Sequence, residues 1–356
     1  MAGRASGDAR SKLHVLVVDD SAVVREVLTG LLSGEPGMDV ATAGDPIIAM
    51  EKMKKRRPDV IVLDLEMPRM DGLTFLRKIM REDPIPVVVC SGVAGDGTEA
   101  AFRAMAEGAV DIVHKPRVGL RDFLYESAIL LVDVVRAASE ARLEVKTRAI
   151  APHPPPSAEA NRGFSAGTII AIGASSGGPE AIRIVLDSMP ADAPATLIVQ
   201  HMPQPFTRAF AARLDATSPM RVREAKDGDA VERGSVLVAP GNMHMRLARR
   251  GAQLAVEVFD GPLVTRHRPS VDVLFRSMAE VAGRAGVGVL LTGMGEDGAD
   301  GLLEMKRAGA ATIAQDERTS VVFGMPARAI QRGAADAVVG LERLADEILR
   351  RCPRRA

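Results

Sequence analysis

The feature that most constrains this chain is a regular alternation of short, valine-rich runs with longer amphipathic segments. Such runs are typical of strands buried on both faces, and apolar spacing near 3.6 residues predicts the helices between them. We expect strands at 13–18, 38–43, 60–63, 87–90 and 110–113, and helices at 21–33, 46–55, 73–81, 98–107 and from about 121. Alternating strands and helices predict an α/β domain with a doubly wound parallel sheet.

A proline-rich stretch interrupts this alternation. Residues 149–166 read AIAPHPPPSAEANRGFSA, a composition that cannot build a core and is typical of an exposed, semi-rigid linker. A second alternation begins at residue 168, with strands expected at 168–172, 195–200, 236–239, 254–259, 288–291 and 312–315. Helices are expected near 179 and at 206–214, 271–282 and 301–308. We therefore predict domains at 12–130 and 167–350, both α/β and the second mostly parallel, joined by a helical and then proline-rich segment at 131–166.

Charge and cysteine content limit the classes of partner and compartment. The 356 residues include 46 Lys plus Arg and 46 Asp plus Glu, a balance that argues against nucleic acid or an acidic membrane as the main partner. Cys90 and Cys352 form neither a disulfide framework nor a CxxC motif, which fits a reducing cytoplasm. The polar N-terminus predicts no signal peptide, and no apolar stretch reaches the roughly 18–20 residues of a membrane span. We expect a cytoplasmic protein that is not embedded in a membrane.

Acidic residues follow the expected strands of the first domain. Asp19 and Asp20 come after the first strand, Asp64 after the third, Ser91 after the fourth and Lys115 after the fifth. Strands of a parallel sheet end at one edge, and clustered carboxylates there favour a hard cation such as Mg²⁺. A carboxylate beside that ion can attack phosphorus, with the lysine offsetting phosphoryl charge and the serine donating a hydrogen bond. The competing interpretation makes each acid a helix N-cap, which is favoured for one aspartate but not for the whole set.

The runs VLVVDDSAVVR, DVIVLDLEMPRMDGLTFL, SG and DIVHKP resemble a two-component receiver domain over residues 12 to about 130. The resemblance implies a flavodoxin-like, five-stranded fold in which Asp64 accepts the phosphoryl group. It further implies that Asp19 and Asp20 hold Mg²⁺, with the backbone carbonyl of Glu66 as another ligand. Receivers often carry Tyr or Phe three residues before the lysine, where this chain has Ile112. The resemblance therefore supports phosphorylation but not an aromatic rotamer switch.

Three strand ends of the second domain carry a serine, a histidine and an aspartate. Ser175 lies in the glycine-rich turn GASSGGP, His201 directly follows TLIVQ, and Asp297 lies in the loop TGMGEDG. Separately, the turn is equally compatible with a phosphate-binding loop, the histidine with a structural role and the aspartate with a turn residue. Together they favour a catalytic triad, in which Ser175 attacks an acyl carbon, His201 transfers the proton and Asp297 orients the imidazole.

Backbone N–H groups near Gly177 and Met294 are the candidates for an oxyanion hole, because their glycine-rich loops expose backbone donors. His244 and His267 are rival bases. Neither directly ends a strong strand, so we expect them to be cleft or structural residues.

The motifs IGASSGGPEAI, QHMPQPFTRAFAARL, APGNMHM, HRPSVDVLF and LTGMGEDGADG resemble the chemotaxis protein-glutamate methylesterases, the CheB family, from about residue 167 to 345. The resemblance implies hydrolysis of glutamate γ-methyl esters on methyl-accepting chemoreceptors with release of methanol, and commonly deamidation of receptor glutamines. It implies no cofactor for the esterase. It also implies that a chemotaxis histidine kinase phosphorylates the receiver and relieves a block on the esterase cleft.

Two other functions remain open from the residues alone. One is a response regulator whose second domain only binds a partner or a nucleotide, which leaves His201 and Asp297 without a role. The other is a DNA-binding regulator, which is disfavoured because the second domain shows no helix-turn-helix pattern and the chain has no net basic charge.

Overall fold

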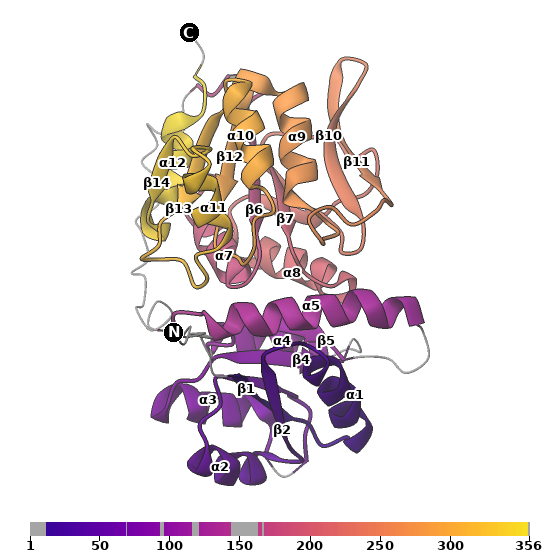
Figure 1. The fold of residues 1–356 in the computed structure, drawn as a ribbon. Coiled ribbons are helices and arrows are strands. Elements are labelled where there is room, and N and C mark those ends of the chain that lie inside the picture. Colours follow the sequence, from indigo (N-terminus) through magenta and orange to yellow (C-terminus); the bar gives the residue numbers. More distant parts are fainter. Residues whose placement is uncertain are drawn as a thin grey trace, which may run out of the picture. The chain divides into compact units, whose positions relative to one another are not determined.

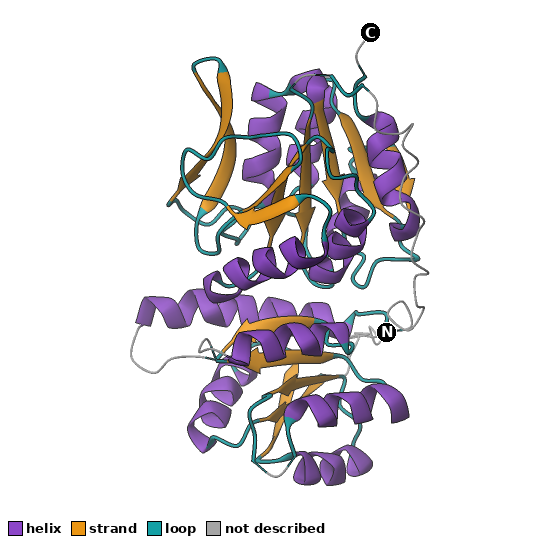
Figure 2. Cartoon of the chain, turned by 180° about the vertical axis from the view of Figure 1, so that it is seen from behind, coloured by secondary structure: helices purple, strands orange, loops and turns teal. Residues whose placement is uncertain are grey.

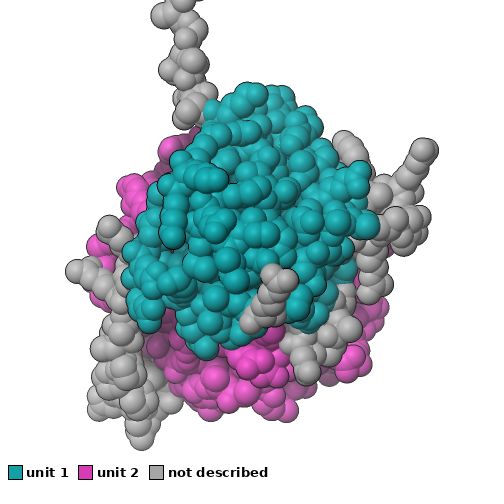
Figure 3. Space-filling model, turned by 90° about the horizontal axis from the view of Figure 1, so that it is seen from below, with its two compact units in different colours: residues 1–92, 107–139 teal, residues 93–106, 140–356 magenta. Residues whose placement is uncertain are grey.

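The structure is a computed structural model that describes residues 12–68, 70–92, 96–115, 121–143, 163–165 and 167–354. The chain divides into two compact units, shown in separate colours in Figure 3. One comprises residues 1–92 and 107–139, and the other comprises residues 93–106 and 140–356.

The first unit contains a five-stranded sheet in which every neighbouring pair is parallel, with the order β2-β1-β3-β4-β5 (Figure 1). Its strands are β1 (Leu13–Val18), β2 (Met38–Ala43), β3 (Val60–Leu63), β4 (Val87–Ser91) and β5 (Asp111–His114). Its helices are α1 (Ala22–Ser33), α2 (Pro46–Lys55), α3 (Gly72–Glu82) and α5 (Arg121–Ser139). The predicted parallel sheet is confirmed. Helix α5 continues to Ser139 within this unit, beyond residue 130, where the sequence placed the end of the first domain.

The second unit contains a seven-stranded, wholly parallel sheet with the order β14-β13-β12-β6-β7-β9-β8. Its strands are β6 (Ile169–Ala174), β7 (Ala195–Gln200), β8 (Arg221–Glu224), β9 (Ser235–Val238), β12 (Gly286–Leu290), β13 (Ala311–Gln315) and β14 (Ala337–Val339). Its helices are α4 (Asp96–Ala106), α7 (Gly178–Asp187), α8 (Gln204–Thr217), α9 (Val271–Val281), α10 (Ala299–Arg307), α11 (Met325–Gln331) and α12 (Leu344–Arg351). The predicted α/β architecture is confirmed here as well.

A two-stranded antiparallel hairpin, β10 (His244–Arg250) with β11 (Gln253–Phe259), stands apart from the main sheet in Figure 2. The run expected at 254–259 therefore pairs locally rather than extending the parallel sheet. Its partner β10 reads HMRLARR and escapes prediction, because four of its seven residues are arginine or histidine.

One hydrophobic core lies between the sheet and the pair α9 and α10. Alternate residues of β6 and β7 belong to it, together with Leu237 of β9 and with Met245, Leu247 and Val256 of the β10–β11 hairpin. Strands β12, β6 and β7 are neighbours at the centre of the sheet, so the loops that follow them share one edge.

The proline-rich linker expected at 149–166 falls almost entirely outside the described residues. Among the helices that the structure describes, none combines the length and apolar character needed to cross a membrane.

Candidate functional sites

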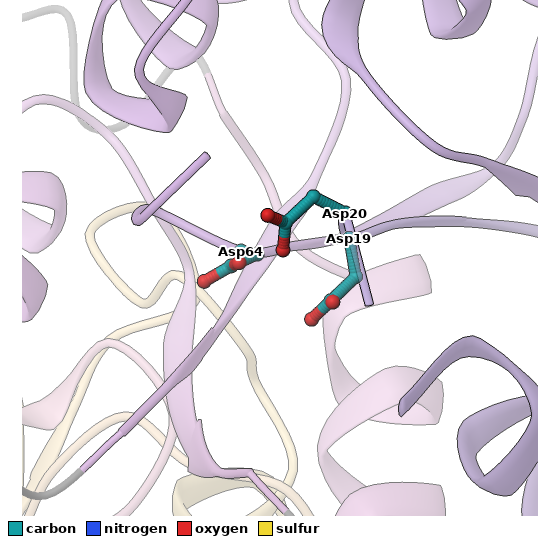
Figure 4. Close-up of side chains that lie close together, drawn as sticks. All are labelled: Asp19, Asp20 and Asp64. Atoms are coloured by element: carbon teal, nitrogen blue, oxygen red, sulfur yellow. The ribbon is translucent and has the colours of Figure 1, made fainter. Parts of the chain in front are cut away.

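The carboxylates of Asp19, Asp20 and Asp64 meet at the carboxyl ends of β1 and β3, where ligand oxygens lie within 4.8 Å of one another (Figure 4). Helix α1 is capped by Ser21 and α3 by Asp71, so the N-cap interpretation of these three acids is wrong. One buried oxygen of Asp19 and one of Asp64 face the Lys115 ammonium and have no other hydrogen-bond partner among the described residues. This donor set fits a hard divalent cation.

Lys115 joins the acidic cluster from the end of β5. Its Nζ lies 2.7 Å from Asp64 Oδ2 and 3.1 Å from Asp19 Oδ2. Burial raises the pKa of Asp64 above its usual value, although the Lys115 hydrogen bond and charge oppose this. Burial by itself would lower the pKa of Lys115, but both carboxylates outweigh it and raise that pKa. The lysine thus remains a cation that can accompany added negative charge.

The other predicted residues of this cluster lie around it. Ser91 is buried at the end of β4, and the Glu66 N–H donates to Asp64 Oδ1 at 3.1 Å. Ile112 is buried in β5, where it occupies the position that an aromatic residue often takes in receivers.

Ser175, His201 and Asp297 each follow one of three adjacent strands, β6, β7 and β12. The His201 Nε2 lies 2.8 Å from Asp297 Oδ2, and both side chains are almost completely buried. The buried Gln200 amide donates to the backbone carbonyls of Ser175 (2.9 Å) and His201 (3.0 Å). This glutamine, which the sequence did not single out, ties together the two strand ends that carry serine and histidine.

Asp297 accepts hydrogen bonds beyond the one to the imidazole. Its Oδ1 accepts from the Ser270 hydroxyl (2.8 Å) and the Asp272 N–H (3.1 Å), and its Oδ2 accepts from the Val271 N–H (2.7 Å). Burial alone would raise the pKa of Asp297, but the hydrogen bond and charge of His201 hold it below its usual range. The aspartate is therefore an ionised, fixed partner for the imidazole.

Ser175 lies in a rigid turn close to His201. Its N–H donates to the Thr292 carbonyl at 3.0 Å, which joins it to the loop after β12. The buried Nδ1 of His201 has no hydrogen-bond partner, and no bond joins it to the Ser175 hydroxyl within the described ranges. Because Nε2 is engaged by Asp297, Nδ1 is the ring nitrogen of His201 that could bond to the Ser175 hydroxyl. Such contacts are often loose before substrate binds.

The two candidate oxyanion donors belong to loops that adjoin the nucleophile. Gly177 has φ +76°, and a side chain there would lie 2.6 Å from Val321, so only glycine fits this close turn. Residue 293, directly before Met294, approaches the Ser175 side chain so closely that an added Cβ would lie 2.7 Å from it. In the part of the chain that the structure describes, neither the Gly177 nor the Met294 N–H donates to a protein acceptor.

The two rival histidines have different positions. His244 bonds through Nε2 to the Pro262 carbonyl at 2.9 Å and through Nδ1 to the Ser270 N–H, which is a structural role. His267 instead stacks on the His201 imidazole, with ring centroids 3.8 Å apart and planes 14° apart. Burial and the neighbouring His201 lower the pKa of His267 to about 3. It is therefore a neutral ring against the proposed base.

A strained turn brings His267 to this position. Val264 and His267 form a bridge around Thr265 and Arg266, whose φ values are +49° and +67°. Left-handed backbone is unfavourable for a β-branched residue such as threonine, so the surrounding structure must hold it in place. No sequence pattern could indicate this stacking, because the turn lacks the glycine or asparagine that usually marks one.

Comparisons with known proteins cover both halves of the chain. Residues 170–348 match the family described as CheB methylesterase, and residues 15–124 match the response regulator receiver domain. A protein from Anaeromyxobacter dehalogenans, named "Protein-glutamate methylesterase/protein-glutamine glutaminase 1", is 56% identical over 94% of this chain and 98% of its own length. A relative from Rhodospirillum rubrum, "Protein-glutamate methylesterase/protein-glutamine glutaminase 2", is also 56% identical, over 95% of this chain and 98% of its own.

The solved structures agree with these sequence matches. The crystal structure of the Thermotoga maritima CheB methylesterase catalytic domain is 36% identical and superposes with a TM-score of 0.51, covering 52% of this chain and 99% of that one. The family match over half of the chain, and identities above 50% over nearly its whole length, establish that this chain belongs to the CheB methylesterase family.

Proposed function

We propose that this protein is a phosphorylation-activated serine hydrolase that demethylates glutamate γ-methyl esters on chemoreceptors and deamidates receptor glutamines. The observation that carries the proposal is the buried 2.8 Å pair of His201 and Asp297 on the strands that flank Ser175. Relatives that match nearly the full chain are named for both activities. A non-catalytic output domain would give this buried, hydrogen-bonded pair no role.

The mechanism follows from the arrangement of the three side chains. The Ser175 oxygen attacks the ester carbon as His201 Nδ1 takes its proton, forming a tetrahedral intermediate. Its oxyanion is stabilised by the N–H groups of Gly177 and Met294. His201 then donates this proton to the ester oxygen, or to the amide nitrogen of a glutamine, so that methanol or ammonia departs and an acyl-enzyme remains. Water activated by the same imidazole releases free glutamate, while Asp297 stabilises the imidazolium at each proton transfer.

The receiver would control this chemistry through its acidic cluster. Asp19, Asp20 and Asp64, with the Glu66 carbonyl, would hold Mg²⁺, which supplies charge neutralisation for an incoming phosphoryl group. Asp64 would accept that group from a chemotaxis histidine kinase, with Ser91 and Lys115 binding its oxygens. By family analogy, phosphorylation relieves a block of the esterase cleft by the receiver.

The domain limits and the compartment belong to the same proposal. We assign residues 12–130 to the receiver, 131–166 to the connecting segment and 167–350 to the methylesterase. The proposed compartment is the cytoplasm, because Cys90 and Cys352 are both free thiols buried in the protein.

A fluorophosphonate probe tests the enzyme directly, because it reacts only with an activated serine. We expect labelling of the phosphorylated protein, loss of labelling and of methanol release in Ser175→Ala, and normal labelling in the control Ser188→Ala. Persistent labelling of Ser175→Ala would show that another serine is the nucleophile, and no labelling of the parent protein would favour a response regulator with a binding-only output domain.

A further inference from the structure

The N-termini of α9 and α10 cap each other through two buried acids. Asp297, just before α10, accepts the N–H groups of Val271 and Asp272 in the first turn of α9. In return, Asp272 Oδ1 accepts the Gly301 N–H in the first turn of α10 at 2.8 Å. Each helix therefore satisfies free backbone donors of the other, a need that every helix N-terminus has.

Helix α10 depends on this exchange because its own N-cap residue cannot supply an acceptor. That residue is Gly298, which has no side chain and makes no side-chain cap bond. Asp272 is 1% exposed and provides the missing acceptor from α9. Only Gly298 separates Asp297 from the first residue of α10. A contact that holds the start of this helix in place therefore also holds Asp297 in place.

Helices α9 and α10 are closely packed where they cap each other. A side chain at Gly301 would lie 2.7 Å from the Phe275 Cβ and 3.1 Å from the Asp272 backbone oxygen. The two helices thus touch at their first turns, and a small movement of one is passed to the other.

The charges that face Asp272 make its burial costly. They are Asp297 and Asp300 from the α10 side, and Arg276 from its own helix at 3.5 Å. Burial, followed by the charge of Asp297, raises the pKa of Asp272 to about 6. A buried carboxylate with a raised pKa beside another carboxylate is an arrangement that often occurs at functional sites.

We propose that Asp272 is a positioning residue, whose buried carboxylate holds Asp297 in register with His201 by capping α10 in exchange for the cap on α9. The inference rests on the proposed function, because it gives Asp297 the role of orienting the imidazole. Asp272 touches neither substrate nor the reacting atoms.

The test compares three variants of the full-length, phosphorylated protein in methanol release. Asp272→Ala removes the acceptor, and we expect kcat to fall about 10–100-fold with KM changed by less than about twofold, since displacement of a catalytic group acts on the chemical step. Asp272→Asn keeps an acceptor and should retain kcat within about threefold. Asp300→Asn removes an exposed charge from the same turn of α10 and should leave kcat unchanged.

A spectroscopic readout separates positioning from general destabilisation. The proton shared by His201 and Asp297 should give a downfield NMR resonance that shifts or broadens in Asp272→Ala and persists in Asp272→Asn. If Asp272→Ala does not fold, Asp272→Ser, which is too short to reach Gly301, replaces it in both measurements.

The outcomes distinguish this inference from the proposed function. Loss of activity in Ser175→Ala, with undiminished kcat and an unchanged resonance in Asp272→Ala, would overturn the positioning role alone. Full activity in Ser175→Ala would overturn the proposed function, while the resonance would still report whether Asp272 holds the pair of His201 and Asp297.

Discussion

At the scale of residues, the buried groups of the esterase site determine one another's charge. Asp297 is kept ionised by its hydrogen bonds, and His267 is kept neutral by burial and by the ring of His201. A neutral ring stacked on the base adds no positive charge that would oppose protonation of His201 during the reaction.

The neutral state of His267 has a consequence for stability. Its pKa is about 3 in the folded protein against 6.5 without the fold, so the unfolded chain binds more protons between these values. The stabilisation that the fold gains from a neutral His267 is fully present above pH 6.5. It is lost as the pH falls towards 3. We expect His267→Gln to flatten the rise of the unfolding free energy between about pH 4 and 6.5, by up to about 1.4 kcal/mol per pH unit. The charged or titratable groups facing this ring are His201, Asp297 and Arg266.

The Asp272→Asn variant is the control for this measurement, because it should change the pH dependence of stability in the opposite direction. The folded pKa of Asp272, about 6, is above its ordinary 3.8, so the folded protein binds more protons between these values and its stability falls as pH rises there. Asp272→Asn should therefore steepen the rise that His267→Gln flattens. Identical chemical-denaturation curves for His267→Gln and the parent at every pH would contradict the prediction.

At the scale of elements, the sequence predicts best where one pattern is complete within a segment. Strands Met38–Ala43, Val60–Leu63 and Ala195–Gln200 have the predicted limits, and α2 begins at its predicted proline. Strand β8 reads RVRE with one buried residue, so no apolar run marks it. The serine, histidine and aspartate were predictable because strand ends share an edge of the sheet, whereas Gln200, His267 and Asp272 act through contacts made only in the fold.

Helices α9 and α10 are in such close contact that adding one methyl group at Gly301 should lower the stability of the second unit. Gly301→Ala would bring Cβ within 2.7 Å of Phe275, and we expect it to destabilise the second unit by about 1–3 kcal/mol. Gly30→Ala, on the exposed face of α1 with nothing within 4 Å, should stabilise the first unit by about 0.5–1 kcal/mol. Hydrogen exchange of the amides in each unit measures both effects, and protection of α10 unchanged by Gly301→Ala would contradict the first.

At the scale of the whole molecule, two parallel sheets carry two different chemistries at their carboxyl edges. The first edge gathers three carboxylates and a lysine, and the second gathers Ser175, His201 and Asp297. The proposed regulation requires the first to change the activity of the second, so that the rate of methanol release depends on phosphorylation.

This regulation predicts that two separate changes each abolish the response of methanol release to a phosphodonor. Asp64→Ala should keep methanol release at its basal level with or without a small-molecule phosphodonor, because the acceptor carboxylate is gone. Removal of Mg²⁺ by a chelator should abolish the phosphodonor response of the parent protein and leave basal release unchanged, because the proposed serine mechanism uses no metal. Methanol release from methylated receptors measures both, and a full phosphodonor response in Asp64→Ala would refute the proposed switch.

Strand β6 pairs with β7 on one side and with β12 on the other, and these two neighbours are far apart in the sequence. The segments that carry the three proposed catalytic side chains are therefore synthesised at different times. Ser175 and His201 are synthesised before Asp297, which follows the serine by about 120 residues. At 5–20 residues per second, that interval is on the order of 10 s, during which the nascent chain has a nucleophile and a base without their acid. The proposed triad therefore cannot assemble until β12 and the loop that follows it have been synthesised, whatever the state of phosphorylation.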